Sequence, residues 1–345
     1  MSVSSVSPRD TRTLAKIKAL LERVDITLDE HLDYVCAVFD DEDEPIATGS
    51  AFGSTLRCFA VDPAHQGEGL LNEIITHLME NRLERGLSHL FVYTKPGSAK
   101  FFKDLGFTEI ASVPGYLIFL ENRKTGFSDY LRQLAAQKRP GRAAAVVMNA
   151  NPFTLGHRWL VEQAAGENDV VHLFMLSENA GPIPAAVRHR LVRAGVADLP
   201  NVVCHETGEY LISSATFPGY FLKSEERVLQ VQARLDTALF LQIAEVLGIE
   251  ARYLGSEPRS VVTGIYNEVL SQTLPAHGIA CRILPRRELP DGRIISASAV
   301  RQAIHDADLD SATDMLPETT LDYFRSPEAA PIVAAIRRAQ NVVHH

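Results

Sequence analysis

The sequence predicts an α/β chain of two domains, an N-terminal α+β domain followed by a domain built on a doubly wound parallel sheet. The chain has 345 residues, enough for about two domains. Strand and helix patterns alternate strictly in its second half, as they do where crossovers join parallel strands. A basic stretch with proline and glycine lies between the halves, at residues 137–142. We place the domain boundary there, giving domains of residues 1–137 and 141–345.

The composition excludes several classes of protein. Hydrophobic residues make up 46% of the chain and charged residues 22%, so packed cores are expected and disorder is not. A formal net charge of −9 argues against a nucleic-acid partner. No apolar run reaches the roughly 18 residues of a membrane span, and the N-terminus has no secretory h-region. Four widely spaced cysteines predict neither a metal site nor disulfides, and they fit a reducing cytoplasm best.

The N-terminal domain begins with an amphipathic helical pattern at residues 14–24. Two strand patterns follow at 34–39 and 46–52, and the acidic turn between them indicates a hairpin. The remaining predicted elements are a strand at 56–61, a helix at 70–85, a strand at 89–94, a short helix at 98–105 capped by Gly106, and strands at 107–112 and 116–120.

The second domain is predicted to hold five strands, each followed by a helix. The strands are at 143–149, 170–176, 202–206, 252–255 and 280–285, and the helices at 156–165, 185–199, 225–247, 261–274 and 298–306. A further amphipathic helix is expected within 319–345. Doubly wound sheets bind ligands beyond the carboxyl ends of their strands, so the loop after the first strand is the first place to look for chemistry.

That loop reads Asn-Ala-Asn-Pro-Phe-Thr-Leu-Gly-His, from Asn149 to His157. Gly156 lets backbone approach a ligand closely, and the following helix N-terminus offers unpaired N–H groups with a partial positive charge. Thr154 adds a hydroxyl and His157 an imidazole over the same terminus. We expect a phosphate cradle here, to which Asn149 and Asn151 also belong. An ordinary histidine at a helix start is the alternative interpretation.

A second candidate site is the run Ile-Ser-Ala-Ser-Ala-Val-Arg, which ends at Arg301. Ser298 is predicted to be the N-cap of a helix, and Ser296 can also point toward the helix start. Arg301, one turn inside, can fork onto a phosphate. Two hydroxyls and a guanidinium at a helix start suit the β and γ phosphates of a nucleotide. Taken alone, the run could also be a serine-capped surface helix.

Three weaker candidates lie between these motifs. Gly255 and Glu257 sit at a strand end in Gly-Ser-Glu-Pro and could contact a ribose or adenine, or form a simple turn. Lys223 is a candidate phosphate cation, or a lysine in solvent. Residues 263–267 and Arg259 could line the acyl or ribose side of the site.

The Thr-x-Gly-His and Ile-Ser-x-Ser-x-x-Arg runs resemble the two signatures of the nucleotidylyltransferase superfamily. The resemblance implies a Rossmann-like domain that binds ATP with Mg²⁺. It places Thr154 and His157 at the α and β phosphates, where they stabilise the transition state of attack on the α-phosphorus. Lys223 is the further catalytic candidate.

The turn after the third strand of the N-terminal domain resembles motif A of the GNAT acetyltransferase fold. Gln66, Gly67 and Gly69 stand where that motif gives backbone N–H groups to the pyrophosphate of coenzyme A. The chain departs from the family at Leu71, where a small residue is usual, and at Phe102, where a tyrosine general acid is common. The resemblance implies a GNAT-like fold, and the two departures favour a domain that binds the CoA-like group over one that catalyses acetyl transfer.

A GNAT-like domain ahead of this nucleotidylyltransferase-like domain resembles the citrate lyase ligase family over nearly the whole chain. The resemblance implies an acid–thiol ligase. Acetate attacks ATP to give acetyl-adenylate and pyrophosphate. The thiol of a CoA-like prosthetic arm, carried by the acyl carrier subunit of citrate lyase, then takes the acetyl group and releases AMP. The acetyl thioester activates the lyase, and the GNAT-like domain would hold the arm.

Three other functions remain open at this point. A plain adenylyltransferase acting on phosphopantetheine or a nucleotide would need basic residues near its acceptor, and Arg188, Arg190 and Arg193 are candidates. A GNAT-type N-acetyltransferase would depend on the first domain alone. A chaperone that binds the carrier protein would tolerate the loss of His157.

Overall fold

A computed structural model describes residues 2–179, 181–211, 217–222, 224–256, 261–339 and 342. The chain divides into two compact units, and the predicted fold class is confirmed in both. Unit 1 comprises Met1–Ser128 and Pro218–Val231, and unit 2 comprises Asp129–Phe217 and Gln232–His345. The boundary predicted at 137–141 did not anticipate that residues 218–231, well inside the second predicted domain, belong to unit 1.

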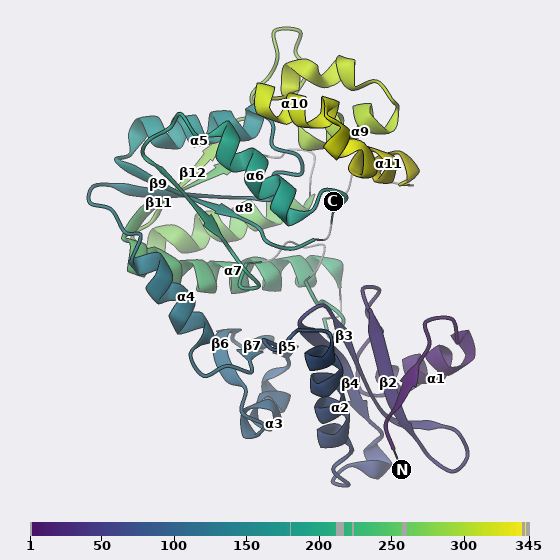
Figure 1. Cartoon of the computed structure of the whole chain (residues 1–345). Helices are drawn as coiled ribbons and strands as arrows, with labels where there is room; N and C mark the ends of the chain where they lie inside the picture. Colours follow the sequence, from purple (N-terminus) through teal and green to yellow (C-terminus); the bar gives the residue numbers. More distant parts are fainter. Residues whose placement is uncertain are drawn as a thin grey trace. The chain divides into compact units, whose positions relative to one another are not determined.

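Unit 1 is built on a seven-stranded mixed sheet in the order β1-β2-β3-β4-β5-β7-β6 (Figure 1). The strands are β1 (Ser4–Val6), β2 (Tyr34–Phe39), β3 (Pro45–Phe52), β4 (Thr55–Val61), β5 (Phe91–Thr94), β6 (Thr108–Val113) and β7 (Leu117–Glu121). β4 and β5 run parallel and pair only at Thr55–Phe91 and Leu56–Val92. The two strands therefore separate toward their carboxyl ends, which leaves an opening in the middle of the sheet.

The helices of unit 1 are α1 (Thr11–Glu22), α2 (Leu70–Glu84) and α3 (Ala99–Asp104). α2 buries Ile74 and Leu78 against β3. Gly49 of β3 makes this packing fit, because a Cβ there would lie 2.5 Å from Ile74 Cγ2. The sequence did not predict β1 or α4 (Gly126–Ala135). β1 is only three residues long and depends on pairing with β2.

Unit 2 is built on five parallel strands in the order β10-β9-β8-β11-β12. They are β8 (Ala143–Met148), β9 (Val170–Met175), β10 (Val202–Glu206), β11 (Ile249–Gly255) and β12 (Ala280–Leu284). From β8 the sheet grows to one side through β9 and β10, and to the other through β11 and β12. The strand order thus reverses beside β8, and in doubly wound sheets this is where ligands bind.

Helices cover both faces of this sheet. They are α5 (Leu155–Glu167), α6 (Ala185–Gly195), α7 (Glu225–Leu247), α8 (Val261–Thr273), α9 (Ala297–His305), α10 (Glu318–Arg325) and α11 (Ala330–Arg338). The residues of α7 up to Val231 belong to unit 1. α5, α6 and α9 to α11 share one core with the sheet, and Arg252 of β11 contacts α7 and α8 on the other face. The single helix expected after residue 319 is two helices, separated at Ser326–Pro327. No helix within the described residues is long and apolar enough to cross a membrane.

Candidate functional site

The two predicted phosphate motifs of unit 2 meet at one cavity of about 390 Å³. It lies beyond the carboxyl ends of β8, β11 and β12. Its walls include Asn149, Asn151, Thr154, Gly156, His157, Gly255, Ser296, Ser298 and Arg301, all of which the sequence singled out. Thr263 also lines the cavity. Lys223, Glu257 and Arg259 lie outside the described residues.

Thr154 and His157 hold each other in place at the start of α5. Thr154 is the N-cap, with an extended backbone, and its Oγ1 accepts a hydrogen bond from the His157 N–H at 3.4 Å. In return, His157 Nδ1 accepts one from the Thr154 N–H at 3.1 Å. The ring of Phe153 stacks on the imidazole, with centroids 5.9 Å apart. This reciprocal capping box fixes the orientation of the imidazole as well as the first turn of the helix.

The hydrogen bonds of His157 also set its chemistry. Burial lowers the pKa of the imidazole to about 4, and the charges of Arg286 and Arg301 act in the same direction. The ring is therefore neutral near pH 7. Because Nδ1 accepts a hydrogen bond, the neutral ring carries its hydrogen on Nε2. His157 thus offers an uncharged N–H donor to a ligand in the cavity.

Gly156 allows the two motifs to pack together. A Cβ at this position would lie 3.3 Å from the carbonyl oxygen of Ile295 and 3.4 Å from its Cγ2. These distances are tight for a real side chain, so the hydrogen of glycine is what lets the second motif lie against the first helix turn.

The second motif is capped differently from the prediction. α9 begins at Ala297, and the N-cap is Ser296, not Ser298; Ser296 Oγ accepts a hydrogen bond from the Ala299 N–H at 3.1 Å. Ser296 is the residue with the extended backbone (φ −143°) that an N-cap requires. Ser298 lies in the first turn of the helix instead.

Arg301 also lines this cavity, and the phosphate fork predicted for it stays a prediction. Its side chain is buried, and burial lowers its pKa to about 10. Nε donates to the carbonyl of Val342 at 2.6 Å, one terminal nitrogen donates to the carbonyl of Asn151, and the other donates to Ser298 Oγ at 3.3 Å. The guanidinium therefore ties α9 to the first motif and to the end of the chain.

The two asparagines of the first motif have different environments. Asn149 is held by Arg188, whose guanidinium donates to both its backbone and side-chain oxygens at 2.6 Å. Arg188, considered above as an acceptor-site residue, is thus a buried support for this loop. The Asn151 amide is 3% exposed and has no hydrogen-bond partner among the described residues. A buried amide in this state at a cavity wall is a group that a nucleotide could satisfy.

Two arginines of this cavity were missed by the sequence predictions. Arg286 and Arg287 follow β12 after Pro285 and line the same walls. Arg286 is half-buried, and its Nε donates to the carbonyl of Ser256 at 3.2 Å. The side chain of Arg287 is exposed. The signal that could have found them is a basic pair immediately after a parallel strand, at the ligand-binding edge of the sheet.

No group of three or more His, Cys, Asp or Glu side chains that could hold a metal ion occurs within the described ranges, which do not include Glu257.

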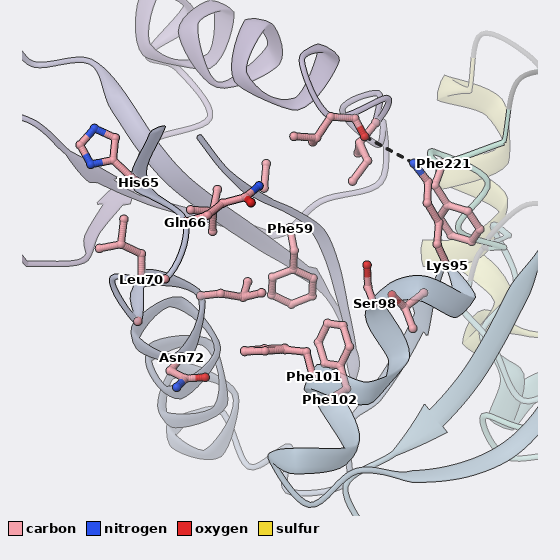
Figure 2. Close-up of a pocket in the computed structure, with 18 of the residues that line it drawn as sticks. Phe59, His65, Gln66, Leu70, Asn72, Lys95, Ser98, Phe101, Phe102 and Phe221 are labelled. Atoms are coloured by element: carbon pink, nitrogen blue, oxygen red, sulfur yellow. Dashed lines mark hydrogen bonds between the residues drawn. The ribbon is translucent and has the colours of Figure 1, made fainter. Parts of the chain in front are cut away.

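Unit 1 contains a second cavity, of about 540 Å³, where β4 and β5 separate (Figure 2). The predicted residues Gln66, Gly67 and Gly69 line it, as do Leu71 and Phe102. Gly67 and Gly69 have φ values of +90° and +82°, which favour glycine, and Gly69 is the N-cap of α2. The turn therefore presents the N-terminus of α2 at the cavity.

Aromatic rings form the middle of this cavity. Figure 2 shows the rings of Phe59, Phe101 and Phe102 gathered opposite the turn that carries Gln66. The rings of Phe59 and Phe102 lie 5.4 Å apart between centroids. Phe102 is buried, and it is packed edge-on against Phe101 and Phe107. The position where a tyrosine acid is common in the GNAT family therefore belongs here to an apolar cluster.

The wall of this cavity is completed by residues far away in the sequence. Tyr220 and Phe221, from the 218–231 segment, are both buried and line it. The Thr27 N–H and hydroxyl both donate to the carbonyl of Tyr220, at 2.8 and 3.0 Å. Lys95 Nζ donates to the carbonyl of Val24 at 3.4 Å, the dashed contact in Figure 2. No local signal in the sequence connects Tyr220 with this pocket.

A family model described as the citrate lyase ligase C-terminal domain matches residues 143–324. The citrate (pro-3S)-lyase ligase of Escherichia coli K12 is 35% identical over 331 residues, 93% of either chain. That of Klebsiella pneumoniae is 38% identical over 322 residues, 90% of this chain and 94% of the relative. The chain belongs to the citrate lyase ligase family. This confirms the resemblance drawn from its motifs, and membership makes the chain a ligase.

Other matches of this citrate lyase ligase cover only part of the chain. A phosphopantetheine adenylyltransferase of Staphylococcus carnosus is 32% identical over 71 residues, 20% of this chain and 44% of that protein. A GNAT-family acetyltransferase structure from Staphylococcus aureus is 10% identical and covers 35% of this chain and 98% of its own, with a TM-score of 0.30. An aminoglycoside 6'-N-acetyltransferase complexed with coenzyme A is 12% identical, with coverages of 35% and 96% and the same TM-score.

Proposed function

We propose that this chain acetylates the thiol of the CoA-like prosthetic arm on the acyl carrier subunit of citrate lyase. The reaction uses ATP, passes through acetyl-adenylate, releases pyrophosphate and AMP, and activates the lyase. One observation carries the proposal: in a member of the citrate lyase ligase family, both nucleotide motifs line a single cavity at the reversal point of the sheet.

In the first step an oxygen of acetate attacks the α-phosphorus of ATP, and the bond from that phosphorus to the bridging oxygen of pyrophosphate breaks. Acetate is already ionised at pH 7, so no general base is required. Negative charge grows on the α-phosphate and on the departing pyrophosphate. The described residues supply fixed donors for that charge: the N–H groups at the start of α5, His157 Nε2–H and the hydroxyls of Ser296 and Ser298.

The cavity residues fit a nucleotide. The buried Asn151 amide supplies both a donor and an acceptor, and Gly156 keeps the helix start open to close approach. Mg²⁺, where bound with the triphosphate, would neutralise phosphate charge and take most of its ligands from phosphate oxygens and water.

In the second step the sulfur of the arm attacks the acetyl carbon, and the bond from that carbon to the AMP oxygen breaks. We propose that the cavity of unit 1 holds the arm. The N-terminus of α2, reached through Gly67 and Gly69, suits its pyrophosphate. The rings of Phe59, Phe101 and Phe102 suit the apolar part of its pantetheine chain.

The decisive experiment measures pyrophosphate release by the full chain with ATP and a panel of carboxylates, with and without a thiol-bearing acyl carrier protein. We expect release to require a carboxylate, with acetate best, and an acetyl thioester to appear only when the carrier is present. Release that is indifferent to acetate would contradict the proposed function.

A plain adenylyltransferase is the second candidate, because a phosphopantetheine adenylyltransferase matches part of the chain. Such an enzyme transfers AMP to a phosphate, so its pyrophosphate release would depend on phosphopantetheine or a nucleotide rather than on acetate. The same assay with 4'-phosphopantetheine in place of acetate separates the two. A GNAT-type N-acetyltransferase is less favoured, because Phe102 has no hydroxyl and is packed among other rings.

A further inference from the structure

The chain contains a single tryptophan, Trp159, and this residue lines the cavity of unit 2. It lies on α5, two residues after His157, and it is half-buried. Within the described part of the chain its ring has no aromatic partner, and its indole N–H has no hydrogen-bond acceptor. Neither of the two motifs in this cavity includes Trp159, and the site described so far assigns it no role.

The packing of α5 does not account for this indole. Val161 and Ala164 of the same helix are in the core of unit 2, and Leu160 packs against that core. Trp159 is not among the described residues that form or border this core. A tryptophan side chain can bury about 150–250 Å² of surface, so a half-buried ring at a cavity wall keeps apolar surface that a ligand can cover.

The position of Trp159 on α5 places it beyond the groups that suit phosphate. The N–H groups that α5 leaves unpaired belong to its first turn, where Thr154 and His157 also lie. Trp159 comes three residues after Gly156, and residues three apart on a helix are neighbours along the same side. Gly156 lies against the second motif, because a Cβ there would be 3.3 Å from the carbonyl oxygen of Ile295. Trp159 is therefore one turn further along α5, beside the place where the two motifs meet.

The cavity wall carries other apolar residues besides Trp159, among them Leu160, Pro285 and Ile295. Leu160 is the next residue on α5, and Ile295 lies against Gly156. The wall thus has two kinds of surface, hydrogen-bond donors at the helix starts and apolar side chains next to them. A nucleotide has the same division, with charged phosphates at one end and a flat base with apolar faces at the other. Aromatic side chains bind bases by stacking on those faces.

We propose that the indole of Trp159 stacks on the base of the nucleotide bound in this cavity and favours a purine there. The inference rests on the proposed function and assigns the base end of the same site. Stacking strengthens with the area over which two faces overlap, and a purine offers two fused rings where a pyrimidine offers one. Adenine occurs both in ATP and in the CoA-like arm. Because the donors in the first turn of α5 suit a triphosphate, we assign the stacked ring to ATP.

The test uses the full chain, in which Trp159 is the only source of tryptophan fluorescence. Its emission is followed during titration with ATP, UTP, inorganic triphosphate or dephospho-CoA, each with Mg²⁺. Calorimetry gives the Kd of each ligand for the unmodified chain, Trp159→Ala, Trp159→Phe and Gln163→Ala. Gln163 is the matched neighbour, because it lies one turn later on the same side of α5 and does not line the cavity. Acetate-dependent pyrophosphate release gives kcat and KM, and the melting temperature of each variant checks its fold.

We expect ATP to change the emission of Trp159 with the Kd that calorimetry gives, and dephospho-CoA to leave the emission unchanged. Trp159→Ala should raise the Kd of ATP about tenfold, as for the loss of one stacking partner. Trp159→Phe should recover part of this affinity, because it keeps an aromatic face. The Kd of UTP should rise less than that of ATP, and the Kd of triphosphate, which has no base, should not change.

The kinetic constants should separate in the same way. In Trp159→Ala the KM for ATP should rise while kcat is retained, because stacking on the base is equally strong in the ground state and the transition state. Gln163→Ala should match the unmodified chain in kcat, KM and every Kd.

Three results would overturn the inference. The first is a Kd of ATP in Trp159→Ala within about threefold of that of the unmodified chain, which is less than one stacked base contributes. The second is an equal rise in the Kd of ATP and of triphosphate, which would place the effect at the phosphates or in the fold. The third is an emission change with dephospho-CoA and none with ATP, which would assign the stacked ring to the arm.

The same data distinguish this inference from the proposed function. Acetate-dependent pyrophosphate release without any effect of ATP on the emission of Trp159 would support the function and contradict the stacking. An effect of ATP on the emission together with release that is indifferent to acetate would support the stacking and contradict the function.

Discussion

The two cavities of this chain differ in what their walls are made of. That of unit 2 is lined by hydroxyls, amides, an imidazole and guanidinium groups, together with apolar side chains such as Trp159 and Leu160. That of unit 1 is larger and is lined mainly by aromatic and aliphatic side chains, with polar backbone at one turn. Attack on a phosphorus is controlled by fixed charges and donors, whereas holding a long, mostly apolar arm depends on shape. Under the proposed function, the difference predicts that adenylation and arm binding respond to separate sets of substitutions.

Of the substitutions considered, His157→Ala should have the largest effect, and this effect should be confined to adenylation. Removing one donor to the transition state slows adenylate formation by roughly 10²–10³, or about 3–4 kcal/mol, as at an oxyanion hole. The matched control is His65→Ala, which removes a histidine from the wall of the other cavity. We expect only His157→Ala to slow pyrophosphate release, measured at saturating ATP and acetate. An equal decrease in the rate of pyrophosphate release in the two variants would contradict the separate roles assigned to the two cavities.

The next prediction concerns the stability of unit 2 in acid. Burial lowers the pKa values of His157 and His172 to about 4 and that of His205 to about 3, and all three lie in unit 2. Because the unfolded chain binds these protons from about pH 6.5 downward, the free energy of unfolding should decrease as the pH falls from about 6.5 toward 4. The decrease is about 2 kcal/mol per histidine by about pH 5.

His172→Gln tests this directly. His172 Nδ1 lies 2.8 Å from His205 Nε2 on neighbouring strands, so the variant removes one buried titrating group and one neighbour of the other. Denaturant unfolding between about pH 5 and 7.5 should give a shallower pH dependence than in the unmodified chain. If the free energy of unfolding depends on pH equally in both proteins, His172 and His205 do not have the lowered pKa values described.

The next prediction addresses the turn of unit 1. Gly69→Ala places a side chain at φ +82°, which costs about 1–2 kcal/mol where a left-handed conformation is required. The strain should weaken dephospho-CoA binding to the full chain by about tenfold, measured by calorimetry, and leave acetate-dependent adenylation intact. A loss of adenylation with normal binding would reverse the assignment of the two cavities.

The smallest effect is expected from a pair of glycines on α5. Gly156→Ala should raise the KM for ATP severalfold, because its Cβ would press on Ile295. A Cβ at Gly166, on the same helix, would meet no described atom within 4 Å. Gly166→Ala should therefore stabilise the fold by about 0.5–1 kcal/mol, since alanine is the better helix former. Melting curves and ATP kinetics of both variants provide the check.

The sequence carried most of the information about the fold and the cavity of unit 2, because strand patterns and polar loops alternate so regularly in that unit. Parallel strands end at one edge of a sheet, so loops far apart in the chain were expected to meet there. The sequence predicted Ser298 as the N-cap of α9, whereas the N-cap is Ser296. Both are good capping residues, and only the extended backbone at Ser296 settles it.

Features that depend on tertiary contacts could not be predicted from the sequence. The partners of Arg301 and Arg188 include backbone oxygens, which no residue pattern marks. Arg286 also lines the cavity of unit 2, and it was not predicted because it lies outside both motifs. The 218–231 segment carries no local sign of which core it joins, because aromatic residues bury equally well in either.

That segment bears on how the chain is made. Tyr220 and Phe221 are translated after β8, β9 and β10. The pocket of unit 1 therefore cannot close until three strands of the other sheet have left the ribosome. A fragment that stops at the basic stretch 137–142 would keep every strand of unit 1 and still lack part of its binding wall. Such a fragment would therefore test the proposed arm binding on a cavity without Tyr220 and Phe221.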